Sequence, residues 1–300
     1  MEKTLETNPE ETVEETTIRA VATDMDGTFL DSSSDYDRLR FERIFEHMRR
    51  RRIRFIVASG NQYAQLKTFF PGKDSDIVYV SDNGTALGEE GVLRATTEFP
   101  AELVNAIASF AVDEALSYGS SGSEGVTPGN VTMVLCGLAR AYILEGASAE
   151  FKELARKYYY ETAEISSFER LPDDVFLKLM LEVDPETVDD AVARINERFG
   201  DRIVAVWGGA GSIDIALPGV SKGSTIRRLL ESWRVSSHEL VSFGDADNDL
   251  EMLAMTEHGY AMANTRSDRV RAAAKRRAPS NDDSGVLRVL EELLGIGAST

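Results

Sequence analysis

Short apolar runs alternate with amphipathic stretches along most of the chain, and this alternation predicts the fold. The apolar runs are typical of buried strands, and most end in a cluster of polar residues or glycine. In the first and last thirds of the chain we expect strands at 18–23, 54–57, 77–80, 240–243 and 258–261. We expect helices at 37–50, 63–69, 222–232 and 250–255. This order predicts a parallel α/β sheet, whose ligands bind beyond the carboxyl ends of the strands.

The middle third of the chain has a different pattern of apolar and polar residues. It predicts a hairpin around 89–91, helices at 100–118, 149–159 and 185–199, and strands at 131–136, 175–183, 203–206 and 212–216. A Gly/Ser-rich loop is expected at 119–130. We therefore expect an α+β cap domain, 87–217, inserted into a core domain formed by 18–86 and 218–300. Residues 1–17 are rich in glutamate and predict a disordered acidic tail.

Two carboxylates directly follow the first predicted strand. Asp24 and Asp26 lie two positions apart, and Gly27 allows the backbone to turn so that both face one pocket. Asp24 would then present a nucleophile or a metal ligand, and Asp26 a proton donor one step further out. The alternative is a local turn in which both aspartates only bind nearby N–H groups.

The string Asp-Met-Asp-Gly-Thr-Phe-Leu-Asp at 24–31 resembles the first motif of the haloacid dehalogenase superfamily. Three further stretches match this family in its order: Ser59-Gly60-Asn61, Lys222 in Gly-Val-Ser-Lys-Gly, and the acidic run 244–249. The interval between Ser59 and Lys222 is similar to that of the Cof-type branch (subclass IIB), which inserts its cap domain there. Within that branch, 55–63 and 69–71 look most similar to the bacterial sugar phosphatases.

The resemblance implies a fold and a reaction. The fold would be a Rossmann-like parallel-sheet core with an inserted α+β cap of type C2B. The reaction would be Mg²⁺-dependent hydrolysis of small phosphate monoesters, sugar phosphates above all, through an aspartyl phosphate on Asp24. Asp26 would protonate the leaving alcohol and then activate water. The Mg²⁺ ligands would be Asp24, the backbone carbonyl of Asp26 and Asp245.

The same resemblance implies roles for the remaining polar residues of the motifs. Lys222 would supply a positive charge to the phosphoryl group, which Ser59, Gly60, Asn61 and Asn248 would also bind. Supporting roles fall to Asp249, which would orient Lys222 or a metal-bound water, and to Asn83 and Asn264. Many Cof-type members have arginine at the position of Asn61, whereas asparagine matches the sugar-phosphatase variant.

Other functions fit parts of the same pattern. The nucleophile could pass phosphate to a second hydroxyl, as in a phosphomutase or phosphotransferase, or the chain could be a non-catalytic sensor of Mg²⁺ and phosphate. Intact Asp24, Asp26, Lys222 and Asp245 favour catalysis, because a pure binder needs no proton donor. A calcium loop beginning at Asp245 lacks the glycine and the glutamate that its spacing requires.

The composition narrows the class of partner. A formal net charge of −18 disfavours a nucleic-acid or anionic-membrane surface, so the expected partner is a small phosphorylated metabolite. Cys136 is the single cysteine, which excludes an intramolecular disulfide and predicts a buried structural thiol. We find no signal peptide or apolar run long enough for a membrane span, so the expected location is the cytoplasm. The oligomeric state stays open.

Overall fold

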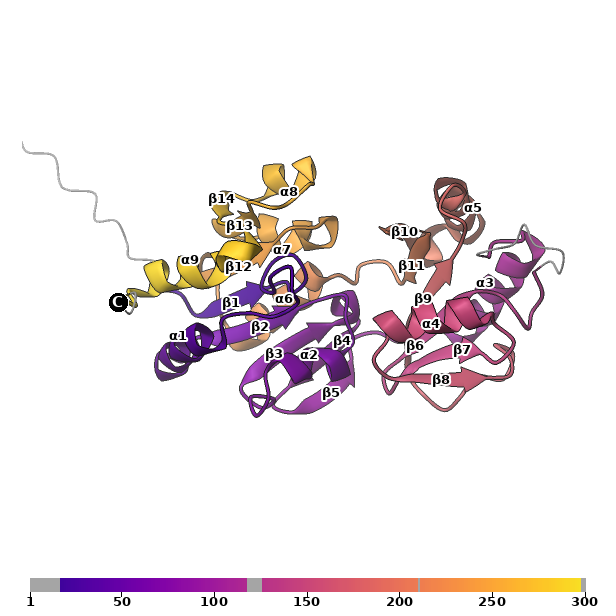
Figure 1. The fold of residues 1–300 in the computed structure, drawn as a ribbon, viewed down its shortest axis with the longest axis horizontal. Coiled ribbons are helices and arrows are strands. Elements are labelled where there is room, and N and C mark those ends of the chain that lie inside the picture. Colours follow the sequence, from indigo (N-terminus) through magenta and orange to yellow (C-terminus); the bar gives the residue numbers. More distant parts are fainter. Residues whose placement is uncertain (1–16, 118–125, 210, 298–300) are drawn as a thin grey trace, which may run out of the picture.

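The structure is a computed structural model that describes residues 17–117, 126–209 and 211–297. Almost all of the predicted acidic tail, and most of the predicted loop at 119–130, therefore lie outside the described residues. Two sheets organise the described part of the chain, and each forms a separate body in Figure 1. None of the described helices is long and apolar enough to cross a membrane.

The larger sheet contains eight strands. In spatial order they are β14 (Arg276–Ala278), β13 (His258–Met262), β12 (Leu240–Gly244), β1 (Ala20–Thr23), β2 (Arg54–Ala58), β3 (Ile77–Ser81), β4 (Ala86–Glu89) and β5 (Val92–Ala95). The strands from β14 to β3 are parallel, whereas β4 and β5 form an antiparallel hairpin in which β4 pairs with β3, the last of the parallel strands. The predicted parallel α/β core is confirmed.

Helices cover both faces of this sheet. One face packs against α1 (Arg38–Arg50), α2 (Tyr63–Phe69) and α9 (Gly285–Leu294). The other face packs against α6 (Lys222–Trp233), α7 (Leu250–Ala254) and α8 (Asp268–Ala273). The helix α1 shows how the sequence dictates this arrangement, because Phe41, Ile44, Phe45 and Met48 are its buried residues and recur at helical spacing.

The smaller sheet contains six strands. In spatial order they are β10 (Val204–Gly209), β11 (Ser212–Ala216), β9 (Phe176–Glu182), β6 (Met133–Gly137), β7 (Ala141–Leu144) and β8 (Thr162–Ile165). Its apolar cluster includes the buried side chains of α3 (Ala101–Asp113), α4 (Ala149–Tyr158) and α5 (Val188–Phe199). The chain thus leaves the larger sheet after β5 and returns to it with α6, which agrees with the predicted inserted α+β unit (Figure 1).

The predicted start of the cap at residue 87 does not match the sheets. The segment 86–95 extends the larger sheet, because β4 pairs antiparallel with β3. The turn at Glu90 and Gly91, where φ is positive, then folds β5 back onto β4. The smaller sheet begins only at Met133 and ends at Ala216. The hairpin therefore belongs with the core sheet, and the division into two domains stays a prediction.

Candidate active site

The end of β1 presents the first two predicted site residues. Asp24 follows Thr23, the last residue of β1, and is 6% exposed. Gly27 has φ of +77°, and a Cβ there would lie 2.6 Å from Asp245 Oδ2. Glycine is thus needed both for the left-handed backbone and for the close approach of Asp245. The turn expected from the sequence is present, and it leaves Asp26 exposed beside the buried Asp24.

A buried lysine from the last third of the chain contacts Asp24 at the end of β1. Lys222 opens α6, is 1% exposed, and its Nζ lies 2.7 Å from Asp24 Oδ1 and 2.7 Å from Asp249 Oδ1. Asp249 Oδ2 accepts hydrogen bonds from the backbone N–H groups of Asp245 and Ala246. Asp249 therefore fixes both the lysine and the loop that carries Asp245, as an orienting residue would.

Asp245 follows β12 and faces the same space as Asp24. Thr28 Oγ1 donates a hydrogen bond of 2.7 Å to Asp245 Oδ1, and Thr265 Oγ1 donates one to the backbone oxygen of Asp245. Within the described residues, no hydrogen bond reaches Asp24 Oδ2 or Asp245 Oδ2. Each of these two aspartates therefore keeps one carboxylate oxygen for another ligand.

The donor set fits a divalent metal ion with a preference for oxygen. Asp24, Asp245 and Asp249 each place a carboxylate oxygen within 4.8 Å of the others. Three carboxylates face one ammonium group, so the cluster carries an excess of negative charge that a cation would neutralise. Both Asp249 oxygens are already hydrogen-bonded, so Asp24 and Asp245 are better placed as direct ligands.

The pKa shifts of Asp24, Asp245 and Lys222 reflect the clustering of these buried charged groups. Burial raises the pKa of Asp24 well above its usual value, and Lys222 opposes this rise. Burial also raises the pKa of Asp245, and the hydrogen bond from Thr28 lowers it. Burial lowers the pKa of Lys222, but the two carboxylates outweigh this effect, so its pKa is raised and the group stays charged. A metal ion would favour the ionised carboxylates, which a nucleophilic Asp24 requires.

The end of β2 carries the second motif. Ser59 is buried, and its Oγ accepts a hydrogen bond from the backbone N–H of Asn61. Asn61 Nδ2 donates a 2.7 Å hydrogen bond to Asp26 Oδ2. Asn61 therefore brings no positive charge, but it orients the carboxylate that is expected to act as the proton donor. Gly60 lies between Ser59 and Asn61 in the sequence, and a Cβ at this position would approach Asn83 Oδ1 to 3.4 Å.

Three asparagines complete the predicted set. Asn248 Nδ2 donates to Asn83 Oδ1 at 3.0 Å, which joins the loops after β12 and β3. Asn264 Nδ2 donates to the backbone oxygen of Gly27, and Asn264 Oδ1 accepts from the backbone N–H of Asn281. Asn264 thus supports the turn at Gly27, directly after Asp26.

The structure brings all the predicted residues to one edge of the larger sheet, and their individual roles stay predictions. Sequence reasoning assigned no role to Thr28 or Thr265, which hold Asp245. Thr28 lies in the first motif, so a hydroxyl four positions after Asp24 was the signal available. The calcium loop is not formed, because Asp247 turns away to Ser267 Oγ and Arg269.

An open cleft of about 830 Å³ lies at this edge. Its lining includes Asp26, Gly27 and Asp245, together with Asn264 and Arg266. This volume is within the range of small-molecule sites.

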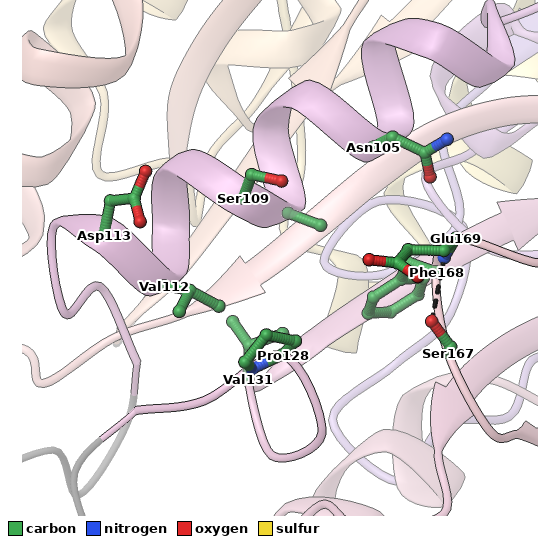
Figure 2. Close-up of a pocket in the computed structure, with 10 residues that line it drawn as sticks. Asn105, Ser109, Val112, Asp113, Pro128, Val131, Ser167, Phe168 and Glu169 are labelled. Atoms are coloured by element: carbon green, nitrogen blue, oxygen red, sulfur yellow. Dashed lines mark hydrogen bonds between the residues drawn. The ribbon is translucent and has the colours of Figure 1, made fainter.

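A second cavity, of about 130 Å³, lies between α3 and the segments around Val131 and Phe168 (Figure 2). Figure 2 shows apolar side chains around it together with the polar Asn105, Ser109 and Ser167 and the acidic Asp113 and Glu169. The one hydrogen bond drawn joins the backbone N–H of Glu169 to Ser167 Oγ. None of its lining residues belongs to the predicted motifs.

Cys136 is buried, and burial raises the pKa of its thiol to about 12. The prediction of a structural thiol is therefore supported, since the thiolate that a nucleophile needs is disfavoured.

Comparison with known proteins identifies the family. The family model for haloacid dehalogenase-like hydrolases matches residues 21–290. The chain is 37% identical over 277 residues to the 5-amino-6-(5-phospho-D-ribitylamino)uracil phosphatase YbjI of Escherichia coli, covering 92% of this chain and 96% of that protein. It is 22% identical over 247 residues to an HMP-PP phosphatase of Escherichia fergusonii, covering 82% and 84%.

Solved structures agree with this result. The crystal structure of SMU.1108c from Streptococcus mutans is similar with a TM-score of 0.81 and 34% identity, covering 93% of this chain and all of that one. A haloacid dehalogenase-like hydrolase from Bacteroides thetaiotaomicron shares the fold, with a TM-score of 0.75 at 20% identity and coverage of 92% and 100%.

The relatives bear out the expected class of enzyme, a phosphoric monoester hydrolase. The fold of this chain, a parallel α/β core with an inserted α+β unit, is likewise shared with the structural relatives. The family model, the alignment with the Escherichia coli phosphatase and the structural similarity all cover the segments that carry the four motifs. The chain therefore belongs to the haloacid dehalogenase-like hydrolases, in their Cof-type branch.

Proposed function

We propose that this chain is a Mg²⁺-dependent phosphatase of small phosphorylated sugars or polyols and that it acts through an aspartyl phosphate on Asp24. The observation that carries the proposal is the contact of Asp24 Oδ1 with Lys222 Nζ at 2.7 Å, which leaves Asp24 Oδ2 without a hydrogen bond among the described residues. Oδ2 is therefore available for attack, and Oδ1, which accepts a single hydrogen bond from the described residues, keeps a second lone pair for the metal ion.

The residues divide the reaction between them. Asp24 attacks phosphorus, and the bond between phosphorus and the leaving oxygen breaks as the new bond forms. Lys222 reduces the negative charge around the transferring group, and the Ser59 hydroxyl donates to a phosphoryl oxygen. A Mg²⁺ held by Asp24, the Asp26 carbonyl and Asp245 would supply further charge neutralisation and fix the orientation of the phosphate.

Asp26 is proposed as the acid and base of the two half-reactions. Its carboxyl group is exposed, and Asn61 holds one of its oxygens at 2.7 Å. In the first step it gives a proton to the leaving alcohol. In the second, as a carboxylate, it takes a proton from the water that attacks the aspartyl phosphate and restores Asp24.

The substrate class follows from the site and from the relatives together. The acidic surface of the chain disfavours large polyanions. The name of the Escherichia coli relative places the phosphate on a ribityl chain, which is a polyol. We therefore extend the class of hydroxyl-rich phosphate monoesters to this chain.

The test is phosphate release from a panel of sugar, polyol and aryl phosphates by the purified protein. We expect release that stops with a chelator, returns with Mg²⁺, and falls at least about a thousandfold in Asp24→Asn, because the amide is a poor nucleophile and a weak ligand. Turnover that needs no metal, or that a folded Asp24→Asn variant retains, would contradict the proposal.

A further inference from the structure

A cavity of about 390 Å³ lies between the part of the chain that forms the larger sheet (the core) and the part that forms the smaller sheet (the cap). It is separate from the cleft at the catalytic carboxylates. The core lines it with Gln62, Lys67 and Asp82, and the cap lines it with Arg140 and Glu161. The backbone N–H of Glu161 donates to Gln62 Oε1 across this junction. The volume is that of a site for a small molecule, and both parts of the chain contribute to it.

Asp82 is the unusual member of this lining. The residue is 4% exposed, and no described residue donates a hydrogen bond to its carboxylate. The nearby positive charge that acts on it is Lys178 on β9, whose Nζ is bonded to Asp214 Oδ1 at 3.0 Å. Burial raises the pKa of Asp82 to about 7, and Lys178 only partly opposes this effect.

Asp82 lines the cavity, and a carboxylate this deeply buried without a protein donor depends for its hydrogen bonds on what occupies that cavity, water or a ligand. Asp82 also has φ of +49°, in the left-handed region, and the next residue, Asn83, follows at +58°. The loop thus holds an unfavourable backbone conformation that keeps Asp82 against the cavity.

The cavity connects to the chemistry through one residue. The backbone N–H of Asp82 donates to the backbone oxygen of Asn61 at 3.0 Å, and Asn61 Nδ2 donates to Asp26 Oδ2 at 2.7 Å. Asp82 is therefore separated by a single residue from the carboxyl group that is expected to protonate the leaving oxygen. A leaving group that reaches Asp82 from that oxygen would have to extend past Asn61, because the catalytic cleft and this cavity share no lining residue.

We propose that Asp82 is a specificity-determining residue whose carboxylate accepts hydrogen bonds from the hydroxyl groups of a neutral, polyhydroxylated leaving group in the cavity between core and cap. This inference rests on the proposed function and adds to it the residue that recognises the leaving group. A carboxylate anchor selects hydrogen-bond donors and disfavours a second anionic group at the same position.

The test is the substitution Asp82→Asn. Asparagine has the same shape and tolerates a positive φ, so the loop is expected to keep its conformation. The matched control is Asp214→Asn, which makes the same chemical change beside Lys178 but at a residue that does not line the cavity. Both variants are compared with the wild type on a pentose phosphate, the corresponding deoxypentose phosphate and an activated aryl phosphate.

We expect Asp82→Asn to lower kcat/KM for the pentose phosphate at least about tenfold, mostly through KM, because a hydrogen bond to a charged group is lost. The aryl phosphate should lose less than about threefold, because its leaving group offers no hydroxyl donors. The preference for pentose over deoxypentose phosphate should shrink in Asp82→Asn and persist in Asp214→Asn. Equal losses on all three esters, or an unchanged preference, would overturn the role of Asp82.

A second measurement does not depend on turnover. Calorimetric titration with a neutral pentitol should show binding to the wild type and at least about tenfold weaker binding to Asp82→Asn. Equal pentitol affinity in both proteins would refute the inference whatever the activity. If the wild type hydrolyses no phosphate ester yet the pentitol affinities differ as expected, the proposed function fails, and only the hydrogen bonding of polyols by Asp82 stands.

Discussion

Replacing Lys222 by methionine should destabilise the protein strongly at neutral pH. Its ammonium group is buried and bonds two buried carboxylates, each at 2.7 Å. Methionine keeps most of the aliphatic volume, so the substitution mainly removes the charge and leaves Asp24 and Asp249 unpaired. Removing one partner of a buried ion pair costs about 3–5 kcal/mol. We expect the free energy of unfolding to fall by about this amount.

Urea unfolding followed by circular dichroism measures this loss, and Lys73→Met is the matched control. Lys73 Nζ lies 2.8 Å from Glu42 Oε2, but this carboxylate is half exposed, so the same substitution should cost no more than about 1 kcal/mol. The loss in Lys222→Met should also shrink at acidic pH, where the two freed carboxylates become protonated. Turnover should stay low even with excess Mg²⁺. Equal losses in the two variants, or full activity restored by Mg²⁺ alone, would refute this account of Lys222.

Three further substitutions test other parts of the structure. Burial raises the pKa of Glu182 from 4.5 to about 7, so ionisation of this carboxyl group lowers the stability of the fold as the pH rises between these values. Glu182→Gln should therefore leave the free energy of unfolding unchanged near pH 4 and raise it by at most about 3 kcal/mol near pH 8. An equal effect of the substitution at both pH values would contradict this. Thr28→Val removes the donor to Asp245 and should raise the Mg²⁺ concentration needed for half-maximal turnover about 10–100-fold, whereas an unchanged Mg²⁺ dependence would show that Thr28 does not orient a ligand. Gly84 has φ of +96°, and a Cβ there would collide with the backbone oxygen of Ser221, so Gly84→Ala should lower the thermal midpoint, and an unchanged midpoint would contradict the packing.

The elements that the sequence could predict are those with a strong local pattern. The helix α2 has the predicted bounds, and Asp24 follows a buried strand and precedes a turn that only glycine accommodates. The parallel sheet then gathers the polar ends of its strands at one edge, so Ser59 and Asp245 could be expected beside Asp24. Local pattern and topology were sufficient for these features.

Other features depend on tertiary contacts that leave little local signal. The strands β7, β8 and β14 have only three or four residues each, too few to show a period. The hairpin of β4 and β5 joins the core sheet because β3 offers an edge, which no pattern within residues 86–95 reveals. The burial of Asp82 is likewise a product of the junction between core and cap.

The central claim is that Asp24 carries the phosphoryl group during turnover. The most direct test is to quench the enzyme in acid during hydrolysis of a phosphate ester in the presence of Mg²⁺, digest it, and locate the phosphoryl group by mass spectrometry. We expect phosphate on the peptide that contains Asp24, and its absence in Asp24→Asn. Rapid turnover with no phosphorylated peptide, or phosphate on a residue other than Asp24, would contradict the account.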